Sequence, residues 1–338
     1  MSLEFLLGGT ILISLLFYAV LGGADYGGGV WDLLASGKSV KTQRKIISEA
    51  MGPVWEANHV WLILVVVALF TAFPAAFARL SLVFHIPLTV ALFGIVLRGC
   101  AFTFRHYHGH GDGHAADEME WRWGRVFAVA SLITPLVLGV VVGGIYSGRA
   151  TSDVGFVYGW FGAFPVSVGI FALCLFAYVA ATYLTIESDG HPEAQEAFRR
   201  RALWSGAATM VAGGVVLLAG ETSGISNGRT GVSVWAVRGV TLVVALAGLL
   251  QVKKRHFQAS RALAVLEVAL IFAGWGAAQY PYLIPPDISI YSAAAPVGTL
   301  RALTVALAAG AVVLFPSFYY LFYVFKREPV SQSKHYGR

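Results

Sequence analysis

Charged residues are scarce in this sequence. Only 12% of its 338 residues are Asp, Glu, Lys or Arg, whereas 57% are hydrophobic. Ordinary soluble domains carry about 25% charged residues. So few charges cannot solvate the surface of a soluble domain of this size, and the composition therefore predicts an integral membrane protein.

Cysteine, cleavable signals and long polar segments are also lacking. The two cysteines, Cys100 and Cys174, lie in apolar runs without the spacing of a metal site, and we expect no disulfide. The first 24 residues lack a basic start and a small-residue cleavage site, so we expect the first helix to be retained. The short connections leave no room for a water-soluble domain, which predicts one integral-membrane domain over residues 1–338.

The apolar runs predict nine membrane-spanning helices, because about 20 apolar residues cross the hydrocarbon core of a bilayer. This is an all-α polytopic membrane fold. The first and fifth spans run in the same direction and each leads into a basic connection, which suggests a repeat of residues 1–150 in residues 151–285. We therefore expect two four-helix bundles and a peripheral last helix at 297–325. The predicted spans are 5–34, 52–73, 77–104, 122–147, 157–186, 202–221, 234–251, 262–280 and 297–325.

The positive charges are distributed as a membrane topology signal. The net charge is +6, and 19 of the 24 Lys and Arg residues lie in or beside alternate connections and the C-terminal tail. Basic residues in short connections mark the cytoplasmic side of a membrane protein and give no reason to expect nucleic acid as a partner. The sequence therefore predicts an outside N-terminus and a cytoplasmic C-terminus, which agrees with an odd number of spans.

Several polar residues are predicted inside the membrane near its cytoplasmic side. Glu56, Asn58 and His59 fall on the first turns of the second span, Asp25 lies on the first span, and Arg98 approaches the same side on the third. Consecutive helices with short connections usually pack together, so these side chains could form one polar file. A charge at this depth costs roughly 2.5–3.5 kcal/mol, which makes a functional role the default hypothesis. The alternative for Glu56 is a headgroup-level side chain that reaches water.

The glycines around Asp25 allow two interpretations. They can let neighbouring helices approach closely, as small residues do in membrane bundles, or they can loosen the helix so that water reaches the carboxylate. We favour close packing. The glycines concerned are Gly22, Gly23, Gly27, Gly28 and Gly29.

Further candidates are secondary. Glu267, on the eighth span, is a buried-acid candidate with Arg261 as its expected counter-charge, and Arg105 ends the third span. The histidine-rich connection around His106–His114 fixes no ligand geometry, so we expect a solvated loop and no metal site. The isolated His85 is expected to be hydrogen-bonded to a neighbour.

Four segments together resemble subunit II of the cytochrome bd-type quinol oxidases, in particular the short form of the cyanide-insensitive bd oxidases. The segments are GGADYGGGVWDLL, MGPVWEANHVWLI, LRGCAFTFR and AATYLTIESDG, and the late segment QYPYLIPPDISIYSAAAP also fits. The resemblance covers nearly the whole chain. Asp25 and Glu56 match the family's acidic positions, Trp55 and Asn58 lie beside Glu56, and Arg98 matches the family's arginine. Other members carry Gln at the position of His59, so that residue is not expected to be essential.

The resemblance implies a haem-free subunit without catalytic, cofactor-binding or metal-binding residues of its own. Its partner would be a homologous subunit I that holds two b haems, one d haem and the quinol site, in a heterodimer in the bacterial inner membrane. Such a complex oxidises quinol and reduces oxygen to water with cytoplasmic protons. Subunit II would supply part of the proton route and stabilise subunit I. The attachment of small single-helix subunits, quinone or lipid stays open.

Two other functions fit the residues alone. A proton-coupled secondary transporter also uses intramembrane acids and internal repeats, but it would show discontinuous helices around a substrate cavity. A purely structural partner would use its polar residues to bind lipid or quinone.

Overall fold

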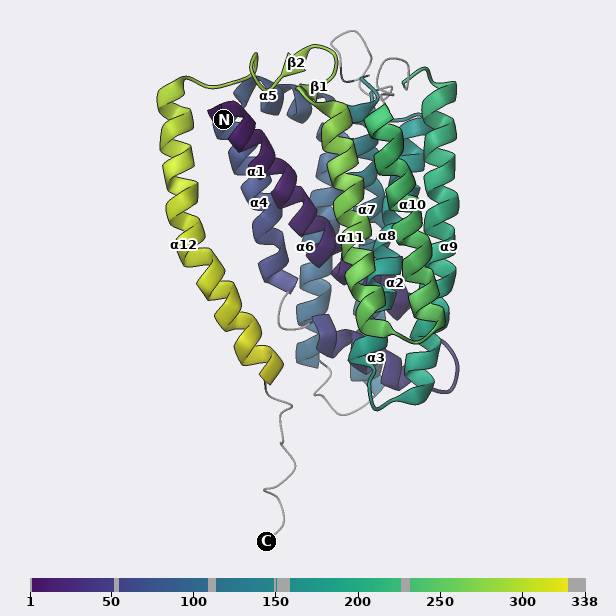
Figure 1. The fold of residues 1–338 in the computed structure, drawn as a ribbon. Helices are drawn as coiled ribbons and strands as arrows, with labels where there is room; N and C mark the ends of the chain where they lie inside the picture. The colour runs from purple at the N-terminus through teal and green to yellow at the C-terminus, as the bar shows by residue number, and fades with distance from the viewer. Residues whose placement is uncertain are drawn as a thin grey trace.

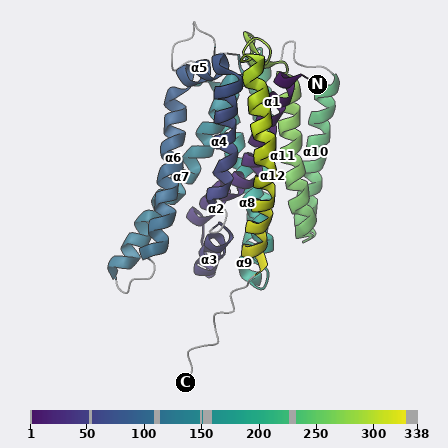
Figure 2. The ribbon, with the colours of Figure 1, turned by 90° about the vertical axis from the view of Figure 1, so that its left-hand side faces the viewer.

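The chain forms a bundle of long helices that run roughly along one axis (Figures 1 and 2). The computed structural model describes residues 2–51, 55–108, 114–148, 150, 159–225 and 232–327, with the backbone alone at 55–57, 105–108, 114–121, 232–233, 322 and 324–327. Within these ranges eight helices are long and apolar enough to span a membrane, and one bent pair provides a ninth candidate. The predicted all-helical polytopic membrane fold is therefore confirmed.

The helices follow one another with short connections, as the apolar runs predicted. In chain order the elements are α1 (Leu3–Phe17), the π-helix η1 (Tyr18–Gly22), α2 (Gly23–Leu33), α3 (Val40–Met51), α4 (Trp55–Ala72), α5 (Pro74–Val83), α6 (His85–His108), α7 (His114–Tyr146), α8 (Ala163–Glu187), α9 (Pro192–Thr222), α10 (Val232–Lys253), α11 (Phe257–Gln279), β1 (Tyr282–Ile284), β2 (Ile288–Ser289) and α12 (Val297–Arg327). The two strands pair antiparallel between α11 and α12. The last helix, α12, stands at the edge of the bundle and packs against α4 and α1 (Figure 1).

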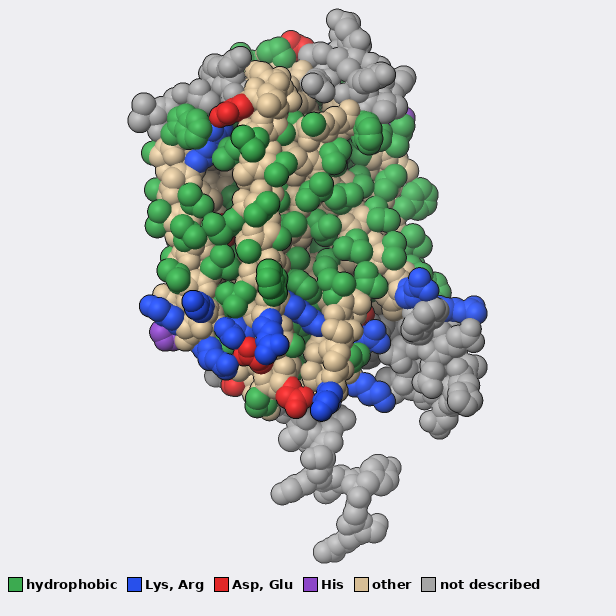
Figure 3. Space-filling model, turned by 90° about the vertical axis from the view of Figure 1, so that its right-hand side faces the viewer, with side chains coloured by type: hydrophobic (Ala, Val, Ile, Leu, Met, Phe, Trp, Pro, Cys, Tyr) green, Lys and Arg blue, Asp and Glu red, His purple; other side chains and the backbone are tan. Residues whose placement is uncertain are grey.

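Lysine and arginine side chains gather at one end of the molecule, which we call the basic end (Figure 3). This end carries α3, the turn between α8 and α9, and the turn between α10 and α11 (Figure 1). Glu196 connects two of these turns, because its carboxylate accepts hydrogen bonds from Arg199, Arg200 and Arg255. The flanks of the bundle are covered with hydrophobic side chains, as a lipid-facing surface requires.

The third predicted span starts later than the sequence suggested. Residues 77–83, which we assigned to that span, belong to α5, and this short helix is bent by 119° from α4. The bend lies at Phe73 and Pro74, where the proline ring removes a backbone donor and disfavours helical geometry in the preceding residue. The crossing helix α6 begins at His85, whose Nδ1 is bonded to the carbonyl oxygen of Leu82, as expected for an isolated histidine.

The first connection contains a helix that the sequence analysis treated as a loop. Helix α3 buries Gln43, Ile46, Ile47 and Met51, which lie on one side of an α-helix, while Lys45 and Glu49 on the other side are exposed. Helix α3 mixes polar and apolar residues, so its mean hydropathy is lower than that of a membrane span. A search for apolar runs could therefore not detect it.

Close packing at glycines fixes the position of α2. A Cβ atom on Gly27 would lie 2.1 Å from the carbonyl oxygen of Phe176 on α8, and one on Gly29 would lie 2.2 Å from Ser131 Oγ on α7. Trp31 on α2 also donates a 2.8 Å hydrogen bond to the carbonyl oxygen of Ala177. The close-packing interpretation of the glycine-rich segment is therefore confirmed.

Replacing Gly27 by alanine should destabilise the protein by about 1–3 kcal/mol, the usual cost of overpacking a tight interior. The added methyl group has no space between α2 and α8. Thermal unfolding of the purified protein in detergent measures the effect. Gly214→Ala on α9 is the matched control, because a Cβ atom there meets nothing within 4 Å. Equal melting temperatures for the two variants would contradict the packing argument.

Candidate functional site

Three helices bring an acid, an amide and a guanidinium into one buried cluster. Asp25 on α2 is 7% exposed, Asn58 on α4 is 4% exposed and Arg98 on α6 is 2% exposed. The Asn58 side-chain amide donates a hydrogen bond to Asp25 Oδ2 and lies 3.5 Å from the carbonyl oxygen of Leu21. We call Asp25, Asn58, Arg98 and the side chains that contact them the Asp25 cluster.

The π-helix η1 gives the first span the shape that this cluster needs. Residues eight apart in a regular α-helix are rotated by about 80° around the axis, so two such side chains diverge. A π-turn adds one residue to the helix and turns this separation into the equivalent of seven, which brings both side chains to one face. Tyr18 is the first residue of η1 and Tyr26 lies beyond it on α2, and their hydroxyl oxygens are hydrogen-bonded at 2.9 Å.

Arg98 is held by aromatic rings and one hydroxyl group. Its Cζ atom lies 4.8 Å from the ring centroid of Tyr26 and 5.1 Å from that of Phe127, and its Nε donates a 3.3 Å hydrogen bond to Ser131 Oγ. Cation–π contacts of this kind stabilise a desolvated charge. Arg98 acts on Asp25 through space, because the two described side chains make no direct ion pair. Within the described part of the chain, Arg98 Nη2 has no hydrogen-bond partner.

His59 and Trp61 extend the cluster along α4. The His59 ring centroid lies 5.9 Å from that of Tyr18 and 6.4 Å from that of Tyr26. Trp61 stacks on Phe17 with ring centroids 4.5 Å apart. The structure thus brings together Asp25, Asn58, His59 and Arg98 from the sequence-based list, and their roles remain predictions.

Three residues on that list lie outside the described side chains. These are Glu56, Trp55 and Arg105, for which only the backbone position on α4 or α6 is described. The first residues of α4 place Glu56 and Trp55 less than one turn from Asn58. The side chains of the histidine-rich connection also lie outside the described residues.

Glu267 lies apart from the Asp25 cluster. The prediction that Arg261 is its counter-charge is wrong. Glu267 is 5% exposed on α11 and interacts electrostatically with Tyr178 on α8. Arg261 makes no ion pair with it among the described side chains, and its guanidinium lies instead 5.5 Å from the ring centroid of Tyr183. The six-residue separation between Arg261 and Glu267 places them on different faces of α11.

Sequence analysis missed the aromatic and hydroxyl members of the cluster. Tyr18, Tyr26 and Ser131 are 4%, 0% and 0% exposed, respectively. The available signals were the position of Tyr26 directly after Asp25 and the presence of a serine hydroxyl in an apolar span. Neither signal identifies a partner on another helix.

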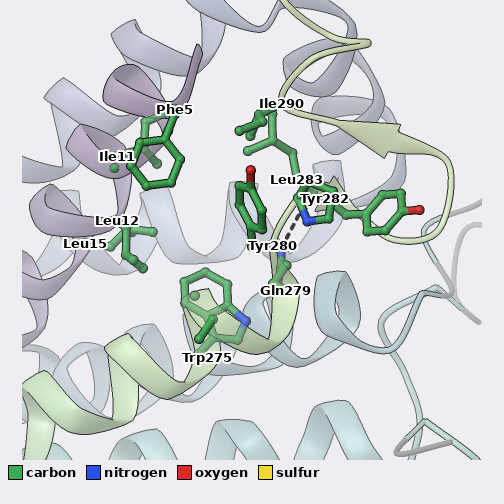
Figure 4. A pocket seen from close by; sticks show the side chains of 15 residues that line it. Phe5, Ile11, Leu12, Leu15, Trp275, Gln279, Tyr280, Tyr282, Leu283 and Ile290 are labelled. Carbon is green, nitrogen blue, oxygen red and sulfur yellow. Dashed lines mark hydrogen bonds between the residues drawn. The ribbon is translucent and has the colours of Figure 1, made fainter. Parts of the chain in front are cut away.

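A separate cavity of about 480 Å³ lies between α1, α11 and the β-hairpin (Figure 4), which meet at the end of the molecule opposite the basic end (Figure 1). The rings of Phe5, Trp275 and Tyr280 border it, and Gln279 Nε2 donates a 2.9 Å hydrogen bond to the carbonyl oxygen of Leu283. Its lining is largely apolar, so it suits a hydrocarbon group and does not form part of the Asp25 cluster.

Comparison with known proteins covers nearly the whole chain. The sequence profile described as "Cytochrome bd terminal oxidase subunit II" matches residues 3–325. A "Putative cytochrome bd menaquinol oxidase subunit II" of Bacillus subtilis is 24% identical over 92% of this chain and 92% of its own length. The "Cytochrome bd-I ubiquinol oxidase subunit 2" of Escherichia coli K12 is 30% identical over 42% of this chain and 35% of its own length.

A solved structure shares the fold. The bd oxidase structure from Geobacillus thermodenitrificans contains a chain that matches with a TM-score of 0.78 at 22% sequence identity, over 96% of this chain and 99% of that one. This similarity supports the all-helical architecture described above. Proteins of the matched family are subunits of oxidoreductase complexes, and the chain belongs to the family of cytochrome bd terminal oxidase subunit II.

Proposed function

We propose that this subunit II supplies part of a cytoplasmic proton route for the reduction of oxygen to water and stabilises subunit I. In this proposal subunit I forms a heterodimer with the chain and holds the two b haems, the d haem and the quinol site. The observation that supports the proton route is the Asp25 cluster, in which three helices bury an acid, an amide and a guanidinium at one place. Structural stabilisation alone would not require titratable groups there.

The orientation of the chain follows from its charges. We place the basic end in the cytoplasm of a bacterial cell, because Lys and Arg in short connections mark that side of the inner membrane. The N-terminus then faces outward and the end of α12 lies in the cytoplasm. Helices α8, α9, α10 and α11 pack in a cycle, which supports a second four-helix bundle that repeats the helices before it.

Asp25 is buried well inside the bundle. It is eight residues from the end of α2 at Leu33, or about 12 Å at 1.5 Å per residue. Protons cannot cross hydrocarbon of this thickness without titratable side chains or ordered water. We propose that Glu56, at the start of α4, takes protons up and that Asp25 relays them inward, with Trp55 and Asn58 as positioning residues.

Arg98 can assist the proposed proton relay through its charge and through one of its hydrogen-bond donors. Its positive charge favours the ionised form of Asp25 without direct contact, so the carboxyl group can release a proton and later take up another. Its Nη2 donor, without a partner in the described residues, suits an ordered water molecule between the two side chains. In this proposal Arg105 and Glu267 are secondary sites.

The position of the bent helix pair and the family of the chain both argue against a proton-coupled transporter. A proton-coupled transporter would be expected to break its helices around a central substrate site. The bend between α4 and α5 lies at the end of the molecule opposite the basic end (Figure 1), and the chain belongs to the family of cytochrome bd terminal oxidase subunit II.

Glu56→Gln should slow oxygen consumption of the purified complex by roughly 100-fold, the lower end of the usual contribution of a proton-transfer group, because it removes that group while preserving side-chain size. Quinol-driven oxygen uptake measures the rate, and the haem spectrum of the same sample measures assembly. The matched control is Glu221→Gln, which removes an exposed acid at the far end of α9. Unchanged turnover in a fully assembled Glu56→Gln complex would exclude the uptake role.

Asp25→Asn should also slow oxygen uptake, since the amide cannot carry a proton between water molecules. His59→Gln is the comparison on the neighbouring helix and should retain nearly normal turnover, because the family tolerates glutamine there. Normal activity of Asp25→Asn with full haem content would contradict the relay assignment. Equal losses in both variants would show that general disturbance of the cluster, and not the carboxyl group, limits turnover.

A further inference from the structure

A second acid and a phenol are buried together in the other half of the bundle. Glu267 on α11 is 5% exposed and Tyr178 on α8 is 1% exposed. Glu267 lies close enough to Tyr178 to act on it electrostatically, and the phenol hydroxyl is a buried group without a hydrogen-bond partner among the described residues. Leaving a buried polar group unsatisfied costs about 1–3 kcal/mol. Something other than the described side chains must therefore satisfy the Tyr178 hydroxyl.

Two glycines shape the space for this phenol. A Cβ atom on Gly206 of α9 would lie 3.0 Å from the Tyr178 ring, and a Cβ atom on Gly248 of α10 would lie 2.7 Å from the Tyr178 hydroxyl oxygen. A glycine inside a helix costs about 1 kcal/mol relative to alanine. The Tyr178 ring and hydroxyl thus occupy space that a side chain at either glycine, on α9 or on α10, would narrow.

Buried hydroxyl groups lead from the basic end toward this pair. Thr182, Thr185 and Ser188 follow Tyr178 along one side of α8, and Ser260 precedes Glu267 by two turns on α11. All four are 0% exposed. Each donates to a carbonyl oxygen of its own helix, so each oxygen keeps a lone pair that can accept a hydrogen bond from water.

This polar region is separate from the Asp25 cluster. Phe176 on α8 stacks on Tyr26 of that cluster, with ring planes 13° apart. Phe176 and Tyr178 are two residues apart and therefore point to nearly opposite sides of the helix. Helix α8 thus carries one polar region on each side.

We propose that Glu267 holds a proton and that ordered water shared with Tyr178 connects it to the hydroxyl groups of α8. Glu267, Tyr178 and these hydroxyl groups are the second proton site of this subunit. The use of this proton in turnover rests on the function proposed above, whereas its presence does not.

Water and a proton suit the site better than a metal cation. Hard cations such as Ca²⁺ take about six to eight oxygen ligands. The described side chains contain no group of three His, Cys, Asp or Glu residues that could hold a metal ion. A protonated carboxyl group needs only one or two hydrogen bonds, which a single water molecule and a phenol can provide.

Infrared spectroscopy of the complex with subunit I tests the proposal without turnover. The spectrum of Glu267→Gln subtracted from that of the unchanged complex should contain the C=O stretching band of a protonated carboxylic acid, and this band should shift in D₂O. Tyr178→Phe removes one hydroxyl group and should move the band to higher frequency, because the shared water loses a partner. Tyr183→Phe, a half-buried tyrosine on the same helix, is the matched control and should leave the band in place.

Each outcome decides a part of the proposal. A subtraction that shows only ionised carboxylate bands overturns the proton assignment, and an unmoved band in Tyr178→Phe overturns the shared water. If Glu267→Gln does not assemble, the D₂O shift and the Tyr178→Phe comparison still decide the question. Normal oxygen uptake in Asp25→Asn and Glu56→Gln would refute the function proposed above and leave the infrared result standing.

Discussion

An ionisable side chain inside a membrane bundle must find its partners within the protein, because lipid offers none. The contact between Asp25 and the Asn58 amide, with Arg98 nearby, satisfies this constraint for the first half of the chain. It joins three successive membrane helices through side chains that are all less than 9% exposed. The relative positions of α2, α4 and α6 therefore depend on polar chemistry as much as on apolar packing.

The backbone of the first span prepares this arrangement. The π-helix rotates Tyr18 onto the face of Tyr26, and the absence of side chains at Gly27 and Gly29 lets α8 and α7 approach. The same approach brings Ser131 close enough to accept a hydrogen bond from Arg98. Close packing and charge compensation are thus two results of one glycine-rich segment.

Helix α8 separates the two buried polar regions of the molecule. One side carries Phe176 against the Asp25 cluster, and the other carries Tyr178 beside Glu267. A bundle that served only to support its partner would be expected to fill both places with apolar side chains, which pack without any hydrogen-bonding requirement. Two buried acids on opposite sides of one helix agree with the proposal that this subunit transfers protons.

The sequence by itself determined the membrane class, the approximate spans and the charged end, because hydropathy and charge are local properties of the chain. It also predicted a polar file of Asp25, Glu56, His59 and Arg98, because neighbouring helices with short connections usually pack together, and the structure brings Asp25, His59 and Arg98 of this set into one cluster. Only the tertiary structure decided the bend at Pro74, helix α3, the π-turn, and the position of Glu267 near Tyr178 and without an ion pair to Arg261 among the described side chains. These features depend on the rotation of each helix about its axis and on contacts between residues far apart in the chain, which no local pattern records.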